Sequence, residues 1–335
     1  MRDLPALWSG QEWRADLEAW LLPALADAGL TPTGPVVQER VRFWSTVLHV
    51  ETSGGRVWVK ENAPSQAFEG ALVAAVDALA PGRTPDVVAV DGAVGRLATR
   101  DLGVPLADAA EVSDDAWVEL VSVWSALQRA LVGHEDAVLA TGLTPFPEDG
   151  AADWTARLAD RLAALPPEDP RRLTGDERTQ VEDGLPRVAS AGRELAGSRL
   201  PATLQHNDLH LGNALVGADR SIAFIDLGDA VWAHPLTAFR IPLWMLAEQR
   251  GVGDPLVLRV QEAALAPWTD LVPASELSGL LPAADRLSAL HRALPWQRLL
   301  DDVPLRVVPE TYRRAAVEWL LIATDPDPFG RWLGG

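Results

Sequence analysis

The chain has 335 residues, a formal net charge of −18 and no cysteine. The lack of cysteine excludes disulfides, thiolate metal sites and cysteine nucleophiles, and the acidic balance argues against non-specific nucleic-acid binding, which needs a basic surface. Neither a run of about 18 apolar residues nor a signal-peptide core is present. We therefore expect a cytoplasmic protein, monomeric or weakly dimeric, with no membrane or nucleic-acid partner and with a small-molecule partner that could be cationic.

The first third of the chain carries mainly strand patterns. Apolar residues at helical spacing predict a leading helix over residues 11–29. β-branched and aromatic runs then predict strands, and a second helical pattern follows them; the predicted strands span 36–42, 45–51, 56–61, 85–90 and 96–99, and the helix spans 64–79. This order predicts a small five-stranded antiparallel unit that holds one helix and ends near Leu102–Gly103.

Beyond that point helical patterns dominate. Helices are predicted over 114–132, 154–165 and 176–195 and over most of 235–323, with short strand-like stretches at 203–216 and 221–226. We therefore predict an α+β protein with two parts. Residues 1–102 would form a β-rich lobe with its leading helix, and residues 103–335 would form a larger, mainly helical lobe.

Lysine is almost absent from this chain. Lys60 is the only lysine among 29 basic residues, and it lies in the strand-like run Arg56–Glu61. Lysine is a compact point charge on a slender stem, whereas arginine is a wide planar fork. Because phosphate sites often use that point charge, we interpret Lys60 as a functional residue.

The strongest local signal is His206-Asn207-Asp208-Leu209-His210-Leu211-Gly212-Asn213, followed by Ile225-Asp226-Leu227-Gly228-Asp229. Asp208 could accept a proton from a nucleophile. Asn213 and Asp226 offer the hard oxygen ligands that suit Mg²⁺ beside substrate phosphates. Together with Lys60, these residues suffice for phosphoryl transfer, in which positioning and charge neutralisation dominate.

These motifs resemble those of a known family. The spacing H-x-D-x-x-x-x-N over 206–213 matches the kinase catalytic loop, and the forms NDLH and IDLGD resemble the aminoglycoside phosphotransferase family more than protein kinases. The resemblance covers residues 36–325. It implies a protein-kinase-like two-lobe fold and an ATP- and Mg²⁺-dependent enzyme that phosphorylates a hydroxyl of a small molecule, such as an aminoglycoside, an amino sugar or a related amine or sugar.

The resemblance also implies individual roles. Lys60 would hold the α- and β-phosphates of ATP, and Glu69 would pair with Lys60. Asp208 would accept the hydroxyl proton of the acceptor, and Asn213 and Asp226 would bind Mg²⁺. The segment Arg100-Asp101-Leu102 would be the hinge that meets adenine.

The sequence indicates the residues that would contact the phosphoryl acceptor less clearly. His210, Asp229, Trp232 and Trp244 are candidate substrate contacts, although the two tryptophans have the spacing of core residues. His206 is interpreted as a packing residue. Arg42–Ser45 occupies the position of the glycine-rich loop of protein kinases, and no activation-loop motif follows Asp226, so a protein substrate is not expected.

Two other functions fit parts of the sequence. His206-x-Asp208-x-His210 could belong to a metal-dependent hydrolase, but no further histidine has ligand spacing. A nucleotide-binding pseudokinase would usually lack one of Lys60, Asp208, Asn213 or Asp226, and all four are present. Only turnover distinguishes the pseudokinase from the enzyme.

Overall fold

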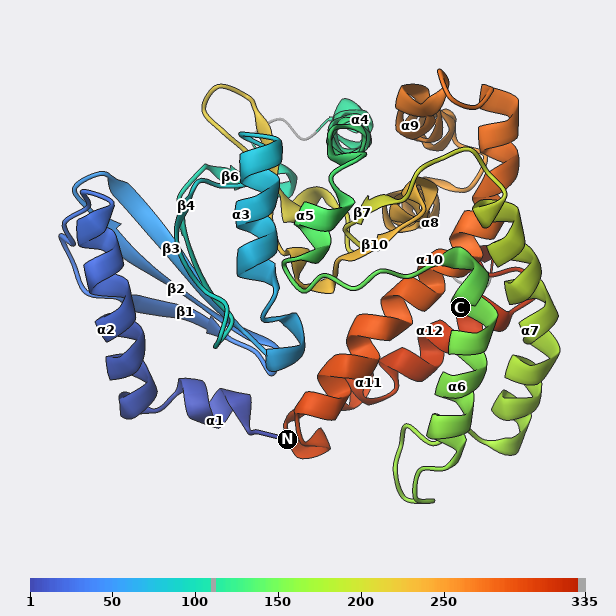
Figure 1. Ribbon diagram of the computed structural model, residues 1–335, viewed down its shortest axis with the longest axis horizontal. Helices are drawn as coiled ribbons and strands as arrows, with labels where there is room; N and C mark the ends of the chain where they lie inside the picture. Colours follow the sequence, from blue (N-terminus) through green and yellow to red (C-terminus); the bar gives the residue numbers. More distant parts are fainter. Residues whose placement is uncertain (110–112, 331–335) are drawn as a thin grey trace.

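A computed structural model describes residues 1–109 and 113–330 and has a small sheet beside a larger helical part (Figure 1). The antiparallel sheet has the order β1-β2-β3-β5-β4; its strands are β1 (Val37–Val41), β2 (Ser45–Thr52), β3 (Gly55–Asn62), β4 (Val87–Asp91) and β5 (Arg96–Arg100). Helix α2 (Gln11–Asp27) lies on its outer face, and α3 (Glu69–Leu79) lies between the sheet and the helical part (Figure 1). The predicted α+β, two-lobe fold is confirmed.

The helical part surrounds two small groups of strands. Its main helices are α4 (Asp114–Leu131), α6 (Ala151–Ala163), α7 (Gly175–Ala196), α8 (Arg240–Arg250), α9 (Pro255–Leu265), α10 (Ala274–Asp302) and α12 (Ala315–Thr324). The strands β6 (Val104–Pro105), β8 (Ala214–Val216) and β9 (Ile222–Phe224) form one sheet, and β7 (Thr203–Gln205) pairs with β10 (Val231–Ala233). These short strands present the two sequence motifs at their ends.

Several short elements were not expected from the sequence. They are α1 (Leu4–Trp8), α5 (Glu135–Leu139), β6 and β10, whereas α11 (Glu310–Arg313) lies within 235–323, which was predicted to be mostly helical. None exceeds five residues, which is too short for a periodic pattern to be read. The helix predicted over 64–79 begins instead as a 3₁₀ turn, Pro64–Gln66, and becomes α-helical at Glu69.

A glycine marks the passage from the sheet to the helical part. Gly103 has φ of +148°, and a Cβ atom there would lie 2.1 Å from the carbonyl oxygen of Val216. Only glycine tolerates both the dihedral angle and this approach. The connection after β5 is thereby held against β8, which directly follows the motif over 206–213.

The two parts share apolar packing away from that connection. Buried residues of α1, α2 and the outer face of the sheet form one cluster with residues at the end of α10, namely Leu299, Leu300 and Val303. Asp302 at that helix end accepts hydrogen bonds from the backbone N–H groups of Arg2, at 3.0 Å, and Ser65, at 2.7 Å. The chain's N-terminus therefore lies against the last turn of α10 (Figure 1).

A buried carboxylate joins the leading helices to the sheet. Trp8 Nε1 donates to Glu61 Oε1 at 2.8 Å, and Trp13 Nε1 donates to Glu61 Oε2 at 2.9 Å. Arg96 Nε donates to the same Oε2 at 2.7 Å. Because successive side chains of a strand point to opposite faces, Glu61 on β3 faces α1 and α2 while Lys60 faces the other way.

We expect Glu61→Gln to destabilise the protein by about 3 kcal/mol, because breaking this buried ion pair leaves Arg96 paired only with the exposed carboxylate of Asp16. Urea unfolding followed by circular dichroism would measure the loss. The matched control is Glu51→Gln on β2, where the exposed pair with Arg56 should contribute less than about 1 kcal/mol. Equal stability of the two variants would contradict the structural importance of the Glu61 cluster.

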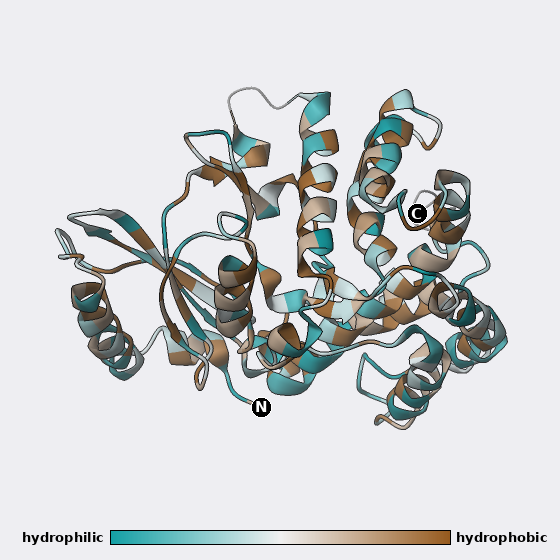
Figure 2. Ribbon diagram, turned by 45° about the horizontal axis from the view of Figure 1, so that its top comes forward, coloured by the Kyte–Doolittle hydropathy of each residue, from teal (hydrophilic) through white to brown (hydrophobic). Residues whose placement is uncertain are grey.

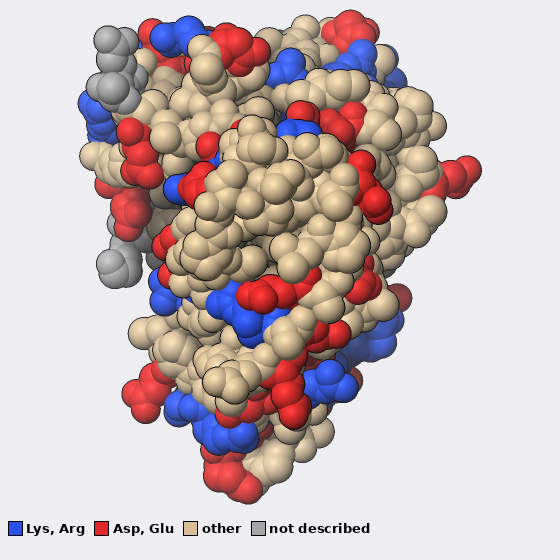
Figure 3. All heavy atoms as spheres, turned by 90° about the vertical axis from the view of Figure 1, so that its left-hand side faces the viewer, with Lys and Arg blue, Asp and Glu red and all other residues tan. Residues whose placement is uncertain are grey.

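One face of the molecule is mixed in charge, and the helices are mixed in hydropathy. Acidic and basic side chains are interspersed over the face that carries α2 (Figure 3), and apolar and polar residues alternate along the helices (Figure 2). Within residues 1–109 and 113–330, no helix is both long and apolar enough to cross a membrane.

Candidate active site

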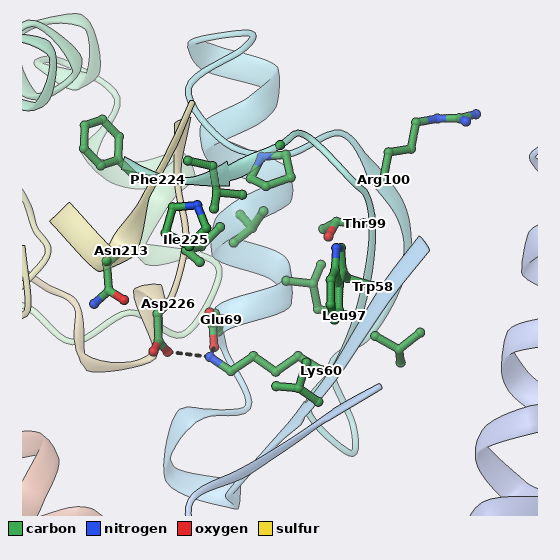
Figure 4. Close-up of a pocket in the computed structure, with 18 of the residues that line it drawn as sticks. Trp58, Lys60, Glu69, Leu97, Thr99, Arg100, Asn213, Phe224, Ile225 and Asp226 are labelled. Carbon is green, nitrogen blue, oxygen red and sulfur yellow. Dashed lines mark hydrogen bonds and ion pairs between the residues drawn. The ribbon is translucent and has the colours of Figure 1, made fainter. Parts of the chain in front are cut away.

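Lys60 lies between two carboxylates that come from different parts of the chain. Its Nζ is 2.6 Å from Glu69 Oε2 on α3 and 2.6 Å from Asp226 Oδ1 after β9 (Figure 4). Burial alone would lower the pKa of Lys60, but the carboxylates of Asp226 and Glu69 outweigh it and raise the pKa. The lysine is therefore a permanent cation at the junction of the sheet and the helical part.

Glu69 is itself fixed from both sides. Asn62 Nδ2 donates to its Oε2 at 2.8 Å, and the backbone N–H of Leu227 donates to its Oε1 at 3.0 Å. Only 1% of the residue is exposed, and this burial raises the pKa of the Glu69 carboxyl group despite the opposing charge of Lys60. Glu69 thus ties α3 to the segment that carries Asp226.

Asp226 has the left-handed backbone conformation, with φ of +63° and ψ of +49°. This conformation is uncommon for residues other than glycine and is tolerated by Asp and Asn. The Lys60 ammonium group lowers the pKa of Asp226. Asn213 lies beside Asp226 at the same end of the pocket (Figure 4), so a carboxylate and an amide oxygen are available there for a hard cation such as Mg²⁺.

Asp208 lies in the turn after β7, close to Asn213. The Nδ2 group of Asn213 donates to the Asp208 carbonyl oxygen at 2.9 Å. Arg292 Nη1 of α10 lies 3.3 Å from Asp208 Oδ1, and His210 Nε2 lies 3.7 Å from Oδ2. Burial opposes ionisation of Asp208, but Arg292 and His210 outweigh it and lower the pKa of the carboxyl group, which keeps it an ionised acceptor.

Asp229 bridges α10 and the sheet lobe. Arg292 Nη1 donates to its Oδ2 at 3.0 Å, and Gln66 Nε2 donates to its Oδ1 at 2.8 Å. Burial raises the pKa of Asp229 to about 6. Arg292 and Gln66 were not among the predicted site residues, because neither lies in a motif and Arg292 follows Asp208 by 84 positions.

A pocket of about 590 Å³ opens beside Lys60. Apolar and small side chains line it from the sheet and from β8 and β9; they include Val47, Trp58, Val59, Leu97, Thr99, Leu215, Phe224 and Ile225 (Figure 4). Lys60, Glu69, Asn213 and Asp226 lie at its polar end. A largely apolar pocket next to a fixed cation has the character expected of a nucleotide site.

The predicted hinge segment lies at the rim of this pocket. Arg100 ends β5 and lines the pocket, but its side chain points away from Lys60 and Asp226 (Figure 4). Asp101 accepts a hydrogen bond from Trp58 Nε1 at 2.7 Å, and Leu102 follows it before Gly103. Any hinge contact with a base would therefore come from the backbone of this segment rather than from the Arg100 side chain.

The predicted acceptor-side residues lie in different surroundings. Trp232 is 3% exposed within the core on β10 and does not line the pocket. Trp244 lies on α8 and is half-buried, whereas His210 and Asp229 contact the Asp208–Arg292 group described above. His206 is fully buried, its Nε2 lies 3.0 Å from the Ile225 carbonyl oxygen, and it packs the loop as interpreted from the sequence.

The turn between β1 and β2 replaces a glycine-rich loop. The backbone N–H of Arg42 donates to the Ser45 carbonyl oxygen at 2.8 Å, which closes the turn. Trp44 packs edge-on against Trp296 of α10, with ring centroids 6.4 Å apart, and Trp296 stacks on Tyr312 at 5.3 Å. The turn is thus held by aromatic packing against the helical part.

Comparisons with known proteins agree with the fold. The macrolide 2'-phosphotransferase MphH from Brachybacterium faecium has a TM-score of 0.58 and 18% identity, over 90% of this chain and 98% of that one. A Plasmodium vivax ethanolamine kinase has a TM-score of 0.60 and 11% identity, over 92% and 85%. Spectinomycin phosphotransferase in complex with ADP and spectinomycin has a TM-score of 0.51 and 12% identity, over 94% and 97%. At these identities the likeness shows a shared fold.

A comparison of the sequence with family models shows family membership in addition to the fold. No curated protein matches the sequence. The model of the phosphotransferase enzyme family matches residues 44–277, which include Lys60, Glu69, the motif over 206–213 and Asp226. The resemblance inferred from the sequence motifs is thereby confirmed, and with it the prediction of a phosphotransferase. This chain belongs to the phosphotransferase enzyme family.

Proposed function

We propose that this enzyme transfers the γ-phosphate of ATP, bound with Mg²⁺, to a hydroxyl group of a small molecule. The observation that carries the proposal is the Lys60 ammonium group held 2.6 Å from both Glu69 and Asp226 at the polar end of the pocket. Phosphoryl transfer depends mainly on such positioning and on neutralisation of charge. A solved phosphotransferase of similar fold contains ADP, which supports a nucleotide in this pocket.

In this proposal each residue has one task. Lys60 neutralises the α- and β-phosphates, and Glu69 keeps its ammonium group in place. Asp226 and the amide oxygen of Asn213 would hold Mg²⁺, which supplies charge neutralisation between the phosphates. The backbone of 100–102 would meet the base. Asp208 orients the acceptor hydroxyl and accepts its proton as the oxygen bonds to phosphorus and ADP leaves.

These positions assign different functions to the two lobes. Residues 1–102 would form the nucleotide-binding lobe, and 103–335 would supply the base, the metal ligands and the acceptor site. We propose aminoglycosides, amino sugars and related amines or sugars as the acceptor class, and a cytoplasmic location. Solved proteins of the same fold include a macrolide 2'-phosphotransferase, an ethanolamine kinase and a spectinomycin phosphotransferase bound to spectinomycin.

The test is ADP release from MgATP across a panel of acceptors, namely kanamycin, spectinomycin, a macrolide, glucosamine, choline and ethanolamine, with GTP tried in place of ATP. Acceptor-dependent release that vanishes in Asp208→Asn would support the proposal and identify the acceptor class. If no acceptor causes ADP release but MgATP still raises the melting temperature, a nucleotide-binding pseudokinase would be favoured. If no acceptor causes ADP release and MgATP does not bind, the proposal would be contradicted.

A further inference from the structure

The catalytic loop is contacted by one short stretch of α10, His291–Pro295, that no sequence motif connects with it. Pro295 lies inside the helix and has no backbone N–H, so the carbonyl oxygen four residues earlier, on His291, has no intrahelical donor. That oxygen accepts a hydrogen bond from Asn207 Nδ2 at 3.3 Å. The proline therefore leaves an acceptor free at the place where the catalytic loop meets the helix.

The neighbouring residue contacts the adjacent position of the loop. Arg292 has 11% of its side chain exposed, and its Nη1 lies 3.3 Å from Asp208 Oδ1 and 3.0 Å from Asp229 Oδ2. Its guanidinium group also lies over the Trp319 ring of α12, 5.5 Å from the ring centroid. A buried, planar guanidinium group that packs on an aromatic ring has little conformational freedom. The Asp208 carboxylate therefore contacts a rigid partner.

The two contacts restrain a strained backbone. Asn207 has φ of +62°, and its Nδ2 also donates to the Asp229 carbonyl oxygen at 2.8 Å. Residues in this region of φ/ψ space persist when their surroundings over-determine them. Here the surroundings are α10 and the segment that ends at Asp229, which Gln66 joins to the sheet lobe.

We propose that His291–Pro295 is a positioning element for the catalytic base: the Arg292 guanidinium group orients the Asp208 carboxylate, and the His291 carbonyl freed by Pro295 fixes Asn207. The inference rests on the proposed function, in which Asp208 accepts the hydroxyl proton. Arg292 does not line the nucleotide pocket, so its effect acts through Asp208 rather than through ATP binding.

Steady-state kinetics of Arg292→Gln and Arg292→Lys tests the first contact, with the acceptor found in the panel. A misplaced catalytic group can cost about 100-fold, so Arg292→Gln should lower kcat by that order while the KM for ATP is unchanged. Arg292→Lys should recover part of the loss because it keeps a cation there. The matched control is Arg298→Gln on the same helix, whose guanidinium group donates to Thr144 Oγ1; it should keep the wild-type kcat.

Pro295→Ala tests the second contact. It supplies an N–H that would compete with Asn207 for the His291 carbonyl, so we expect unchanged or higher thermal stability together with a lower kcat. Pro282→Ala is the control, because that proline lies in the same helix but frees the carbonyl of Ser278, distant in sequence from the Asn207 contact. A fall of kcat in both proline variants would contradict a specific role of Pro295.

Hydrogen–deuterium exchange of the free protein provides a readout that needs no acceptor. Arg292→Gln and Pro295→Ala should exchange faster over 204–213, whereas Arg298→Gln and Pro282→Ala should match the wild type there. Wild-type kcat and wild-type exchange in Arg292→Gln would overturn the inference. If the wild-type protein turns over no ATP, the proposed function fails, and the exchange comparison still decides whether α10 positions the loop.

Discussion

Replacing Asp208 with asparagine should lower kcat by about 10²–10⁴-fold, the range typical for the loss of a general base. Asparagine keeps the shape of the side chain but cannot take the hydroxyl proton. MgATP should still bind, because Asp208 does not line the pocket beside Lys60. The measurement is acceptor-dependent ADP release, together with the rise in melting temperature that MgATP produces.

The control for this prediction is Asp219→Asn, which makes the same chemical change in the exposed turn between β8 and β9. It should retain full activity. A fully active Asp208→Asn enzyme would remove Asp208 from the mechanism. A variant that no longer binds MgATP would show that removing this charge disturbs the nucleotide site as well.

Lys60→Arg should lower kcat/KM for ATP on the order of 100-fold, comparable to the loss of one preorganised donor in an active site. The charge is retained, but the planar guanidinium group is wider than the ammonium group. It cannot occupy a point that is 2.6 Å from both Glu69 Oε2 and Asp226 Oδ1 without moving one of them. Lys60→Met should be at least as damaging because it also removes the charge.

Arg56→Lys is a suitable control on the same strand, since Arg56 pairs with Glu51 at the exposed end of β3. It should leave the kinetics unchanged. Initial rates at varied ATP concentration would give kcat/KM for ATP in both variants. Full activity of Lys60→Arg would mean that the absence of lysine elsewhere in the chain says nothing about the role of Lys60.

The long elements could be predicted from the sequence because periodicity is readable over many residues. The helix predicted over 114–132 is α4, Asp114–Leu131, and the strand predicted over 45–51 is β2, Ser45–Thr52. Short elements such as β6 and β10 depend on pairing with distant strands, Val104 with Val216 and Val231 with Gln205. Local sequence carries no signal for such partners.

The site residues also fall into those that local sequence predicts and those that depend on tertiary contacts. Lys60, Glu69 and Asp226 were predicted from motif and order, and the structure brings them together within hydrogen-bonding distance. Arg292 and Gln66 were missed because their roles arise from tertiary packing alone. A proline inside a helix frees a carbonyl oxygen, and α10 contains two such prolines, but the sequence does not identify the donor that uses the freed oxygen.

The apolar cluster shared by the leading helices, the sheet and the end of α10 has a consequence for heat unfolding. Lobes joined by one connection alone could melt separately, and calorimetry would then record two transitions. Here the sheet cannot lose its outer face without exposing Leu299, Leu300 and Val303 to water as well. The two lobes should therefore melt in a single cooperative transition, so that damage to α1 or α2 weakens the catalytic half of the enzyme too.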